Sequence, residues 1–351
     1  MKNIFLPLLA LLILTFSCSS DDDTFYEEVV IPKGAYENGI IVSSEGGPSS
    51  ISFISEDLSS SENNIYFNVN NEDLGVYLQS VGFHNDLAYI ITDTNHTITI
   101  VNRNTFEKVG TITTGLQTPR YISFLNGKAY VSNWGDSADG TDDFVAVLDL
   151  SSNTVENTIP VGEGPEQVLA NGDKVFVSHK GGWGTNNIVS IIDANSNIVD
   201  TITVNDNPDE MIINNAGELV VLSSGKEAWT GTETLGAIAK IDVNNNTVIS
   251  NFEFEMGVHP NLMDYANGTL YFQTSENKIY TMADTDTALP TTSTIDLTTA
   301  YTYGMAVKGD RLFVADASFS SQSEVVVYDL PSATETHSFS AGIGASKIYF
   351  N

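Results

Sequence analysis

Apolar and polar residues alternate along residues 118–161 in four short runs, which read YISF, AYVSN, VAVLDL and VENTIPV. Gly, Asn, Pro or Asp bounds each run. Alternation with a period of two between turn-forming residues is typical of β-strands, so the segment predicts four consecutive antiparallel strands. The same succession of runs returns in residues 164–204, which indicates that the chain contains a repeat.

The second strand of this repeat is the easiest to count along the chain. Seven copies occur at spacings of 41 to 51 residues: IIVSS at 40, AYIIT at 88, AYVSN at 129, VFVSH at 175, LVVLS at 219, LYFQT at 270 and LFVAD at 312. Repeats of about 40–50 residues with four strands each are typical of propeller blades. We therefore predict an all-β protein, a seven-bladed β-propeller of four-stranded antiparallel blades.

The two ends of the repeat region indicate how the propeller closes. The first repeat has no innermost strand before Ile40, whereas residues 342–351 add one strand too many at the end. We expect residues 346–350 to supply the missing innermost strand of blade 1, which leaves no open sheet edge at the junction. A single propeller then covers residues 37–351. An array of β-sandwiches with the same strand count is the alternative, but it does not explain the sevenfold register.

Residues 1–17 have the pattern of a lipoprotein signal peptide. Their apolar stretch, residues 4–16, is shorter than the roughly 20 residues that a membrane-spanning helix needs. The sequence TFSC at residues 15–18 resembles a bacterial lipobox, so we expect lipidation of Cys18 and a polar tether over residues 18–36. An ordinary cleaved signal peptide with an incidental cysteine is the alternative.

Composition removes several classes of function. The chain has 45 acidic and 14 basic residues, a formal net charge of −31, and such a surface repels phosphate backbones, which argues against a nucleic-acid partner. Cys18 is the only cysteine, which excludes an intrachain disulfide and a Cys-based metal site. The five histidines form no HExxH pattern, and no GxSxG sequence occurs. We therefore expect no enzymatic activity, with a lactonase-like propeller hydrolase as the alternative.

The blade sequence resembles a known family. The pattern of NGK followed by an apolar residue and YV, with later runs such as NTVENTIPV, is similar to YVTN-type propellers. The tail AGIGASKIYF, the opening NGIIVSSEGG and the acidic SSDDD after the signal peptide resemble the surface lipoproteins of Bacteroidetes. That resemblance implies a lipid anchor in the outer membrane with the domain facing the cell exterior. The branch includes proteins that capture cobalamin beside a TonB-dependent transporter.

Three loops between second and third strands are candidate ligand contacts. They read NWGDSADGTDD, HKGGWGTNN and SGKEAWTGTETLG, and each holds one of the only three tryptophans: Trp134, Trp183 and Trp229. Tryptophan offers a large flat apolar area and one hydrogen-bond donor, which suits the faces of sugars and macrocycles. We expect the three to share one binding surface. Alternatively, each tryptophan packs against its own loop.

A second set of candidates lies where the innermost strands begin. Arg120, Glu166, Asp209 and Asn261 each follow a proline, which fits the entry to an innermost strand, so we expect them near the mouth of the central channel. They can hydrogen-bond a ligand, or they pair with one another across the channel. Tyr301 and Tyr303 extend this ring, and His179 opens a loop on the same face of the fourth blade.

One loop also has the oxygen density of a Ca²⁺ site. Asp136, Asp139 and Asp142 lie close together in the sequence, although without the spacing of an EF-hand loop. We therefore expect a solvated acidic loop, with a Ca²⁺ site as the alternative, and no cofactor is required by the sequence.

Together these features predict a surface-anchored binding module that takes up a nutrient and passes it to a TonB-dependent transporter. The family resemblance alone implies a corrinoid (vitamin B12) as the ligand. The family's own ligand contacts are not transferred to this chain, because the blade framework matches but the loop motifs do not. A glycan-binding surface protein and a protein-interaction propeller are the alternatives.

Overall fold

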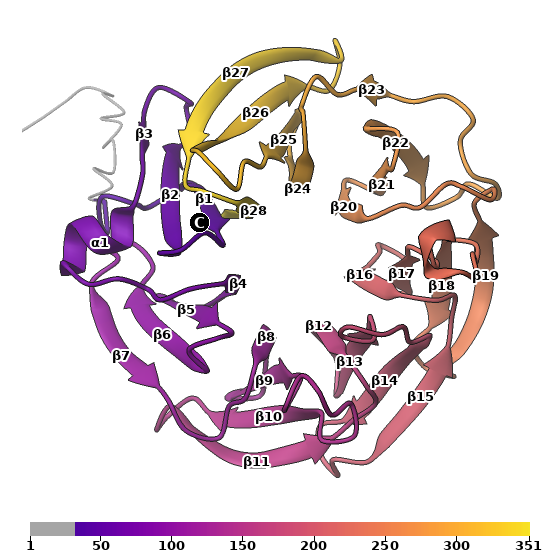
Figure 1. Ribbon diagram of the computed structural model, residues 1–351, viewed down its shortest axis with the longest axis horizontal. Coiled ribbons are helices and arrows are strands. Elements are labelled where there is room, and N and C mark those ends of the chain that lie inside the picture. The colour runs from indigo at the N-terminus through magenta and orange to yellow at the C-terminus, as the bar shows by residue number, and fades with distance from the viewer. Residues whose placement is uncertain (1–31) are drawn as a thin grey trace, which may run out of the picture. The chain divides into compact units, whose positions relative to one another are not determined.

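Seven four-stranded antiparallel sheets stand side by side around a central axis, as Figure 1 shows. This computed structural model describes residues 32–351, and residues 33–351 form one compact unit. The predicted signal peptide, Cys18 and most of the predicted tether lie outside the described residues. The prediction of an all-β, seven-bladed propeller is confirmed.

The strands of each blade run outward from the axis in chain order, except in blade 1. The innermost strands of blades 1 to 7 are β28 (Ala345–Phe350), β4 (Leu78–His84), β8 (Pro119–Leu125), β12 (Pro165–Asn171), β16 (Pro208–Ile213), β20 (Leu262–Ala266) and β24 (Thr302–Lys308). The second strands are β1 (Gly39–Ser44), β5 (Leu87–Thr92), β9 (Lys128–Asn133), β13 (Lys174–His179), β17 (Leu219–Ser223), β21 (Thr269–Thr274) and β25 (Arg311–Asp316). The third strands are β2 (Ser50–Ser55), β6 (Thr97–Asn102), β10 (Phe144–Asp149), β14 (Ile188–Asp193), β18 (Ala237–Asp242), β22 (Lys278–Ala283) and β26 (Ser323–Asp329). The outer strands are β3 (Ser61–Glu62), β7 (Lys108–Ile112), β11 (Thr154–Pro160), β15 (Val199–Thr203), β19 (Thr247–Glu253), β23 (Ile295–Asp296) and β27 (Thr334–Ala341).

The last strand of the chain closes blade 1, as the sequence predicted. β28 pairs antiparallel with β1, with Ile40 opposite Phe350 and Val42 opposite Ile348. Ile40, Val42 and Ile348 are buried in one cluster with side chains from blade 7. The two ends of the propeller are therefore held by a backbone ladder and by a shared apolar core, and neither edge of this sheet junction is left open.

Serines of the second strands explain how neighbouring blades are joined near the axis. Ser132 in β9 accepts the backbone N–H of Tyr121 in its own blade at 3.1 Å. The same hydroxyl donates to the backbone carbonyl of Glu166 in the next blade at 2.5 Å. Ser178 makes the equivalent pair of bonds one blade further on, at 3.1 and 2.8 Å. A small hydroxyl on the buried face of the strand thus satisfies backbone groups that would otherwise lack partners.

The acidic residues that end four third strands hold the turns that follow. Asp149, Asp193 and Asp242 each accept a backbone N–H from two residues further on, at 2.7 to 2.9 Å. Asp329 accepts one from three residues further on at 3.0 Å. Side-chain and backbone hydrogen bonds donated by the residues of these turns lower the pKa of each carboxyl below its usual value. Aspartate side chains that bond the backbone just after them thus hold the tight turns between the third and outer strands of these four blades.

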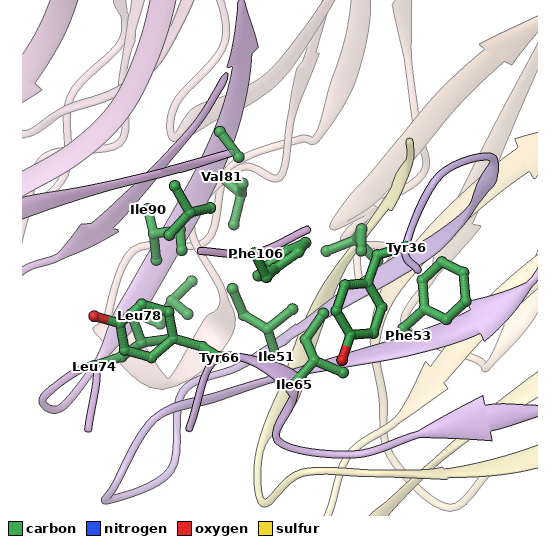
Figure 2. Packing of buried hydrophobic residues seen from close by; sticks show 13 residues of the cluster. Tyr36, Ile51, Phe53, Ile65, Tyr66, Leu74, Leu78, Val81, Ile90 and Phe106 are labelled. Atoms are coloured by element: carbon green, nitrogen blue, oxygen red, sulfur yellow. The ribbon is translucent and has the colours of Figure 1, made fainter. Parts of the chain in front are cut away.

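The apolar core is divided into clusters, each shared by two neighbouring blades. Between blades 1 and 2, the rings of Phe53 and Phe106 meet Tyr36 edge-on, with centroids 5.3 and 5.4 Å apart (Figure 2). The short helix α1 (Ile65–Asn70) buries Ile65 and Tyr66 in the same cluster. This helix was not predicted from the sequence. It covers blade 1 where the outer strand β3 has only two residues. No helix in residues 32–351 is long and apolar enough to cross a membrane.

Candidate functional site

Two sets of loops meet on one face of the propeller, which we call the loop face. The loops that follow the second strands hydrogen-bond to the segments that lead into the innermost strands. The backbone N–H of Trp134 donates to the carbonyl of Thr118 at 3.1 Å, and that of Lys180 donates to Gly164 at 2.9 Å. These contacts bring the two sets of candidate residues from the sequence onto a common surface.

The end of the central channel on this face, which we call the channel mouth, is a cavity of about 140 Å³. Its lining includes the four polar residues that each follow a proline in the sequence, and also Tyr303: Arg120, Glu166, Asp209, Asn261 and Tyr303. Pro119, Pro165 and Pro208 begin β8, β12 and β16, where the missing N–H of proline costs no ladder hydrogen bond.

The polar side chains of the mouth pair with one another. The Arg120 guanidinium donates to both carboxylate oxygens of Glu166, at 2.7 and 3.1 Å, and to Asp93 at 3.1 Å. Lys180 forms an ion pair with Asp209 at 2.6 Å. Of the four candidates, Arg120 and Glu166 therefore pair with one another, from neighbouring blades, whereas Asp209 pairs with Lys180, which was not among them. Asn261 is exposed.

A deeper layer of the channel was missed by the sequence reasoning. Lys347, from the closing strand β28, reaches Glu210 at 3.1 Å, and the Gln167 amide donates to the other oxygen of Glu210. Below this layer the channel widens to a cavity of about 440 Å³ with largely apolar walls. The sequence contained a signal for this deeper layer. Lys347 lies one position after Ser346 in the predicted closing strand, just as Tyr121 lies one position after Arg120 in its innermost strand.

Trp134 and Trp183 come together on the loop face, and we call them the tryptophan pair. Trp134 lies over the Arg120 guanidinium at 4.0 Å, and its indole N–H donates to the carbonyl of Pro165 at 2.9 Å. Trp183 meets Trp134 edge-on, with ring centroids 6.1 Å apart, yet remains 84% exposed. A cavity of about 530 Å³ lies between the two loops and includes both rings in its lining.

Glycine makes this arrangement possible. Gly164 has a φ of 64°, in the left-handed region, and a Cβ at this position would lie 2.0 Å from the backbone nitrogen of Gly182. The segment before β12 and the loop that carries Trp183 therefore approach so closely that only glycine fits. The sequence shows the glycines but not which backbone each one faces.

Trp229 is separate from the tryptophan pair. It lies in the short 3-10 helix η1 (Ala228–Thr230), is 81% exposed, and donates its indole N–H to Glu227 of the same loop at 3.1 Å. Within residues 32–351, no aromatic ring stacks on it. The structure thus brings together two of the three tryptophans that the sequence suggested would share a surface.

Blade 7 carries a second group of aromatic side chains, which we call the blade-7 platform: Tyr301, Tyr303 and Phe319. Tyr301 and Tyr303 stack with centroids 5.6 Å apart, and Phe319 meets both edge-on at 6.2 and 5.6 Å. Phe319 is 58% exposed. Sequence reasoning included the two tyrosines but missed Phe319, although it lies in the loop of blade 7 that corresponds to the tryptophan loops. In Figure 1, β24 of blade 7 lies across the ring from β8 and β12.

His179 is placed differently from the expectation. His179 is fully buried at the end of β13, where Nε2 lies 2.8 Å from the Ser190 hydroxyl and Nδ1 lies 3.2 Å from the Glu163 carbonyl. Burial lowers its pKa to about 4, so the ring is a neutral part of the core near neutral pH. It does not face the loop-face cavities as a ligand contact.

The carboxylates of residues 136–142 turn onto their own loop. Asp142 accepts the backbone N–H of Asp136 at 3.0 Å, and Asp139 accepts both the N–H and the hydroxyl of Thr141 at 3.0 and 2.6 Å. In the described part of the chain, no three His, Cys, Asp or Glu side chains come close enough to hold a metal ion.

The fold and the loop face define the class of this protein as a seven-bladed β-propeller with an aromatic and ion-paired channel mouth. Residues 38–349 match the family model described as "Domain of unknown function (DUF5074)", and the chain belongs to this family. No sequence among the curated proteins matches the chain.

Solved structures with a similar fold have distant sequences. The computationally designed protein Ika8 superposes with a TM-score of 0.59 at 9% identity, covering 91% of this chain and 92% of its own. Hydrazine synthase of Kuenenia stuttgartiensis gives 0.57 at 16% identity, with coverages of 76% and 89%. The Cps50 (Swd1) β-propeller domain of Myceliophteria thermophila gives 0.57 at 11% identity, with coverages of 77% and 87%. At these identities the likeness shows the fold alone.

Proposed function

We propose that this protein is a surface lipoprotein of the YVTN-type propeller class that binds a nutrient molecule on its loop face. The observation that carries the proposal is the exposure of Trp183, a large apolar ring that leans on Trp134 beside a cavity of about 530 Å³. A tryptophan that served only to pack its own loop would be mostly buried, because leaving so much apolar area in water is unfavourable. An exposed ring beside a cavity is suited to a ligand.

The ligand proposed first is a corrinoid. The tryptophan pair offers a flat apolar contact, and the exposed Asn261 at the channel mouth offers hydrogen bonds to amide or hydroxyl groups. A macrocycle with polar substituents on its edge fits that combination. The choice of a corrinoid among such ligands rests on the resemblance of the blade and tail sequences to cobalamin-capturing propellers. A glycan is the second candidate, because the exposed face of Trp183 is equally able to stack on a sugar ring.

The proposed setting is the outer membrane. A lipid on Cys18 would anchor the protein, the acidic residues after it would direct the domain to the cell exterior, and a TonB-dependent transporter would receive the ligand. We propose binding without catalysis, since the three cations of the mouth are held in ion pairs with Glu166, Asp209 and Glu210. The proposal needs no metal or other cofactor.

Calorimetric titration of the purified protein with cyanocobalamin tests this proposal, with wild type compared to Trp183→Ala. The exposed ring makes few contacts within the fold, so its removal should leave the melting temperature unchanged. Loss of a central aromatic contact should weaken binding about 30-fold, or about 2 kcal/mol. Ile198→Ala is the control, because Ile198 is also exposed but lies in the turn between β14 and β15, on the opposite face.

Each result of this titration has a definite meaning. Saturable binding that the Trp183 variant loses and the Ile198 variant keeps supports the corrinoid site on the loop face. Absence of a saturable response at micromolar cyanocobalamin excludes the corrinoid, and a response to an oligosaccharide would then favour the glycan. Equal affinity in wild type and Trp183→Ala would place the site elsewhere on the molecule.

A further inference from the structure

The charges at the channel mouth are unequal in number. Four carboxylates and three cations line the cavity: Glu45, Glu166, Asp209 and Glu210 against Arg120, Lys180 and Lys347. Each cation already pairs with an acid of the lining, through the pairs Arg120–Glu166, Lys180–Asp209 and Lys347–Glu210, at 2.7, 2.6 and 3.1 Å, and Arg120 also pairs with Asp93. Glu45 is the carboxylate that remains.

Glu45 has no close cation. Within residues 32–351, no Lys, Arg or His nitrogen lies within 4 Å of its carboxylate. Its side chain accepts a long hydrogen bond from the Tyr303 hydroxyl at 3.3 Å, and the Ser346 side chain is a second donor close to it. Burial raises the pKa of Glu45 above its usual value, and the attraction of Arg120 and Lys347 offsets this only in part. Removing a carboxylate from water without a partner is unfavourable, so a ligand that supplies positive charge would relieve the cost.

The blade-7 platform stands directly beside this carboxylate. Tyr303 belongs to both, since it stacks on Tyr301 and bonds to Glu45. The backbone N–H of Glu45 donates to the carbonyl of Gly344 at 2.9 Å, and a Cβ built on Gly344 would lie 3.0 Å from the ring of Phe319. Exposed aromatic rings and an unpaired acid thus share one corner of the mouth.

An acceptor without a partner lies in the same cavity. Asp209 bonds to Lys180 through Oδ2, but its buried Oδ1 has no hydrogen-bond partner. This oxygen, like the Glu45 carboxylate, can accept a hydrogen bond but not donate one. The cavity of about 140 Å³ has room for a small head group and not for a macrocycle, since a water molecule in the liquid takes about 30 Å³.

From these observations we propose that the corner of the channel mouth formed by Glu45 and the blade-7 platform binds an organic ammonium group. The ammonium would pair with Glu45 and lie against the faces of the aromatic rings, which attract cations through their quadrupoles. The apolar remainder of the ligand would extend over Tyr301 and Phe319, the exposed rings of the platform. An anion is disfavoured here because it would meet the carboxylate, and a neutral ligand would leave the acid uncompensated.

This inference goes beyond the corrinoid proposal and does not rest on it. The ammonium site belongs to blades 1 and 7, whereas the tryptophan pair belongs to blades 3 and 4, across the ring in Figure 1. Substitutions at one site therefore leave the other intact, and the two proposals fail separately.

The site can be tested with three probes that each carry the same phenyl ring: benzylammonium, benzyl alcohol and benzoate. Each is titrated into the full-length protein, and binding is followed by calorimetry or ligand-observed NMR. Benzylammonium should bind at least tenfold more tightly than benzyl alcohol, and benzoate should not bind. Glu45→Gln should remove this preference. Glu335→Gln is the matched control, because it deletes the same charge from the exposed outer strand β27 of blade 7 and should preserve binding. The control matters because a protein with a net charge of −31 attracts cations everywhere.

A second variant keeps the test valid if Glu45→Gln does not fold. Phe319 is exposed, so Phe319→Leu should fold normally, keep the apolar contact and weaken benzylammonium binding about threefold through loss of the ring. Equal binding of benzylammonium and benzyl alcohol would overturn the proposal. Equal effects of Glu45→Gln and Glu335→Gln would overturn it as well, since the attraction would then come from the overall charge.

Discussion

Removing Arg120 should destabilise the channel mouth far more than a surface charge would. The side chains of Arg120 and Glu166 are 12% and 5% exposed, and the guanidinium holds Glu166 through two hydrogen bonds and Asp93 through a third. Arg120→Ala leaves the buried Glu166 carboxylate without a partner. Breaking a buried pair by removing one member costs about 3–5 kcal/mol, mostly because the other charge stays buried.

This free energy converts to a measurable shift in melting temperature. Unfolding entropy is about 2.1 cal/mol/K per residue, so about 320 ordered residues give about 0.7 kcal/mol/K, and the expected drop is about 5–7 °C. Thermal unfolding followed by circular dichroism at neutral pH measures it. Trp134 lies over the guanidinium, so its fluorescence should change in the same variant before unfolding begins.

Two comparisons isolate the cause of the shift. Lys128→Ala breaks an exposed pair with Glu156 and should cost less than about 1 kcal/mol. The double variant Arg120→Met with Glu166→Gln replaces both charges by neutral side chains of similar size and should recover most of the loss. A melting temperature of Arg120→Ala within 1 °C of wild type would refute the reasoning that the pair is buried and mutually dependent.

Three further predictions follow from the burial of particular groups. Trp134→Ala should lower the free energy of unfolding, measured in urea, by about 2–4 kcal/mol, because Trp134 packs on the Arg120 guanidinium. Trp183→Ala should stay within about 0.5 kcal/mol of wild type, because Trp183 is exposed. Equal effects of the two substitutions would contradict this difference in burial. Burial lowers the pKa of His179 to about 4. Between about pH 6.5 and about pH 4, the histidine is therefore protonated in the unfolded chain and neutral in the folded chain. As the pH falls through this window, the free energy of unfolding of wild type should therefore decrease by up to about 3 kcal/mol relative to that of His179→Asn, because the acidic residues contribute equally in both proteins. Parallel curves of unfolding free energy against pH would show that the histidine is not buried. Deleting residues 345–351 removes β28 and exposes the edge of β1, so the protein should no longer show one cooperative unfolding transition, and an unchanged transition would argue against closure through β28.

The fold could be predicted from the sequence because each blade repeats the same local signals. Turn residues bracket alternating strands, and the count of second strands fixes the number of blades. Closure by residues 346–350 followed from one missing and one surplus strand. Helix α1 could not be foreseen, because six residues are too few to show a helical period, and its Ile65 and Tyr66 are buried in the cluster that blades 1 and 2 share.

The site was harder to predict because it depends on contacts between loops. The three tryptophans share a loop position, yet only Trp134 and Trp183 meet, through a glycine contact that the sequence does not specify. Arg120 and Glu166 were identified as candidates, but only the register of neighbouring blades shows that they satisfy each other. His179 has the position of a loop residue in the sequence and the surroundings of a core residue in the structure.

The central claim is that the loop face around the tryptophan pair binds the ligand. Hydroxyl-radical footprinting with mass spectrometry tests it directly, by comparing oxidation of Trp183 in the free protein and in the presence of saturating cyanocobalamin or an oligosaccharide that binds. Trp183 should be oxidised readily in the free protein and protected in the complex, while Ile198 on the opposite face should be oxidised equally in both. A bound ligand that leaves the oxidation of Trp183 unchanged would contradict the claim.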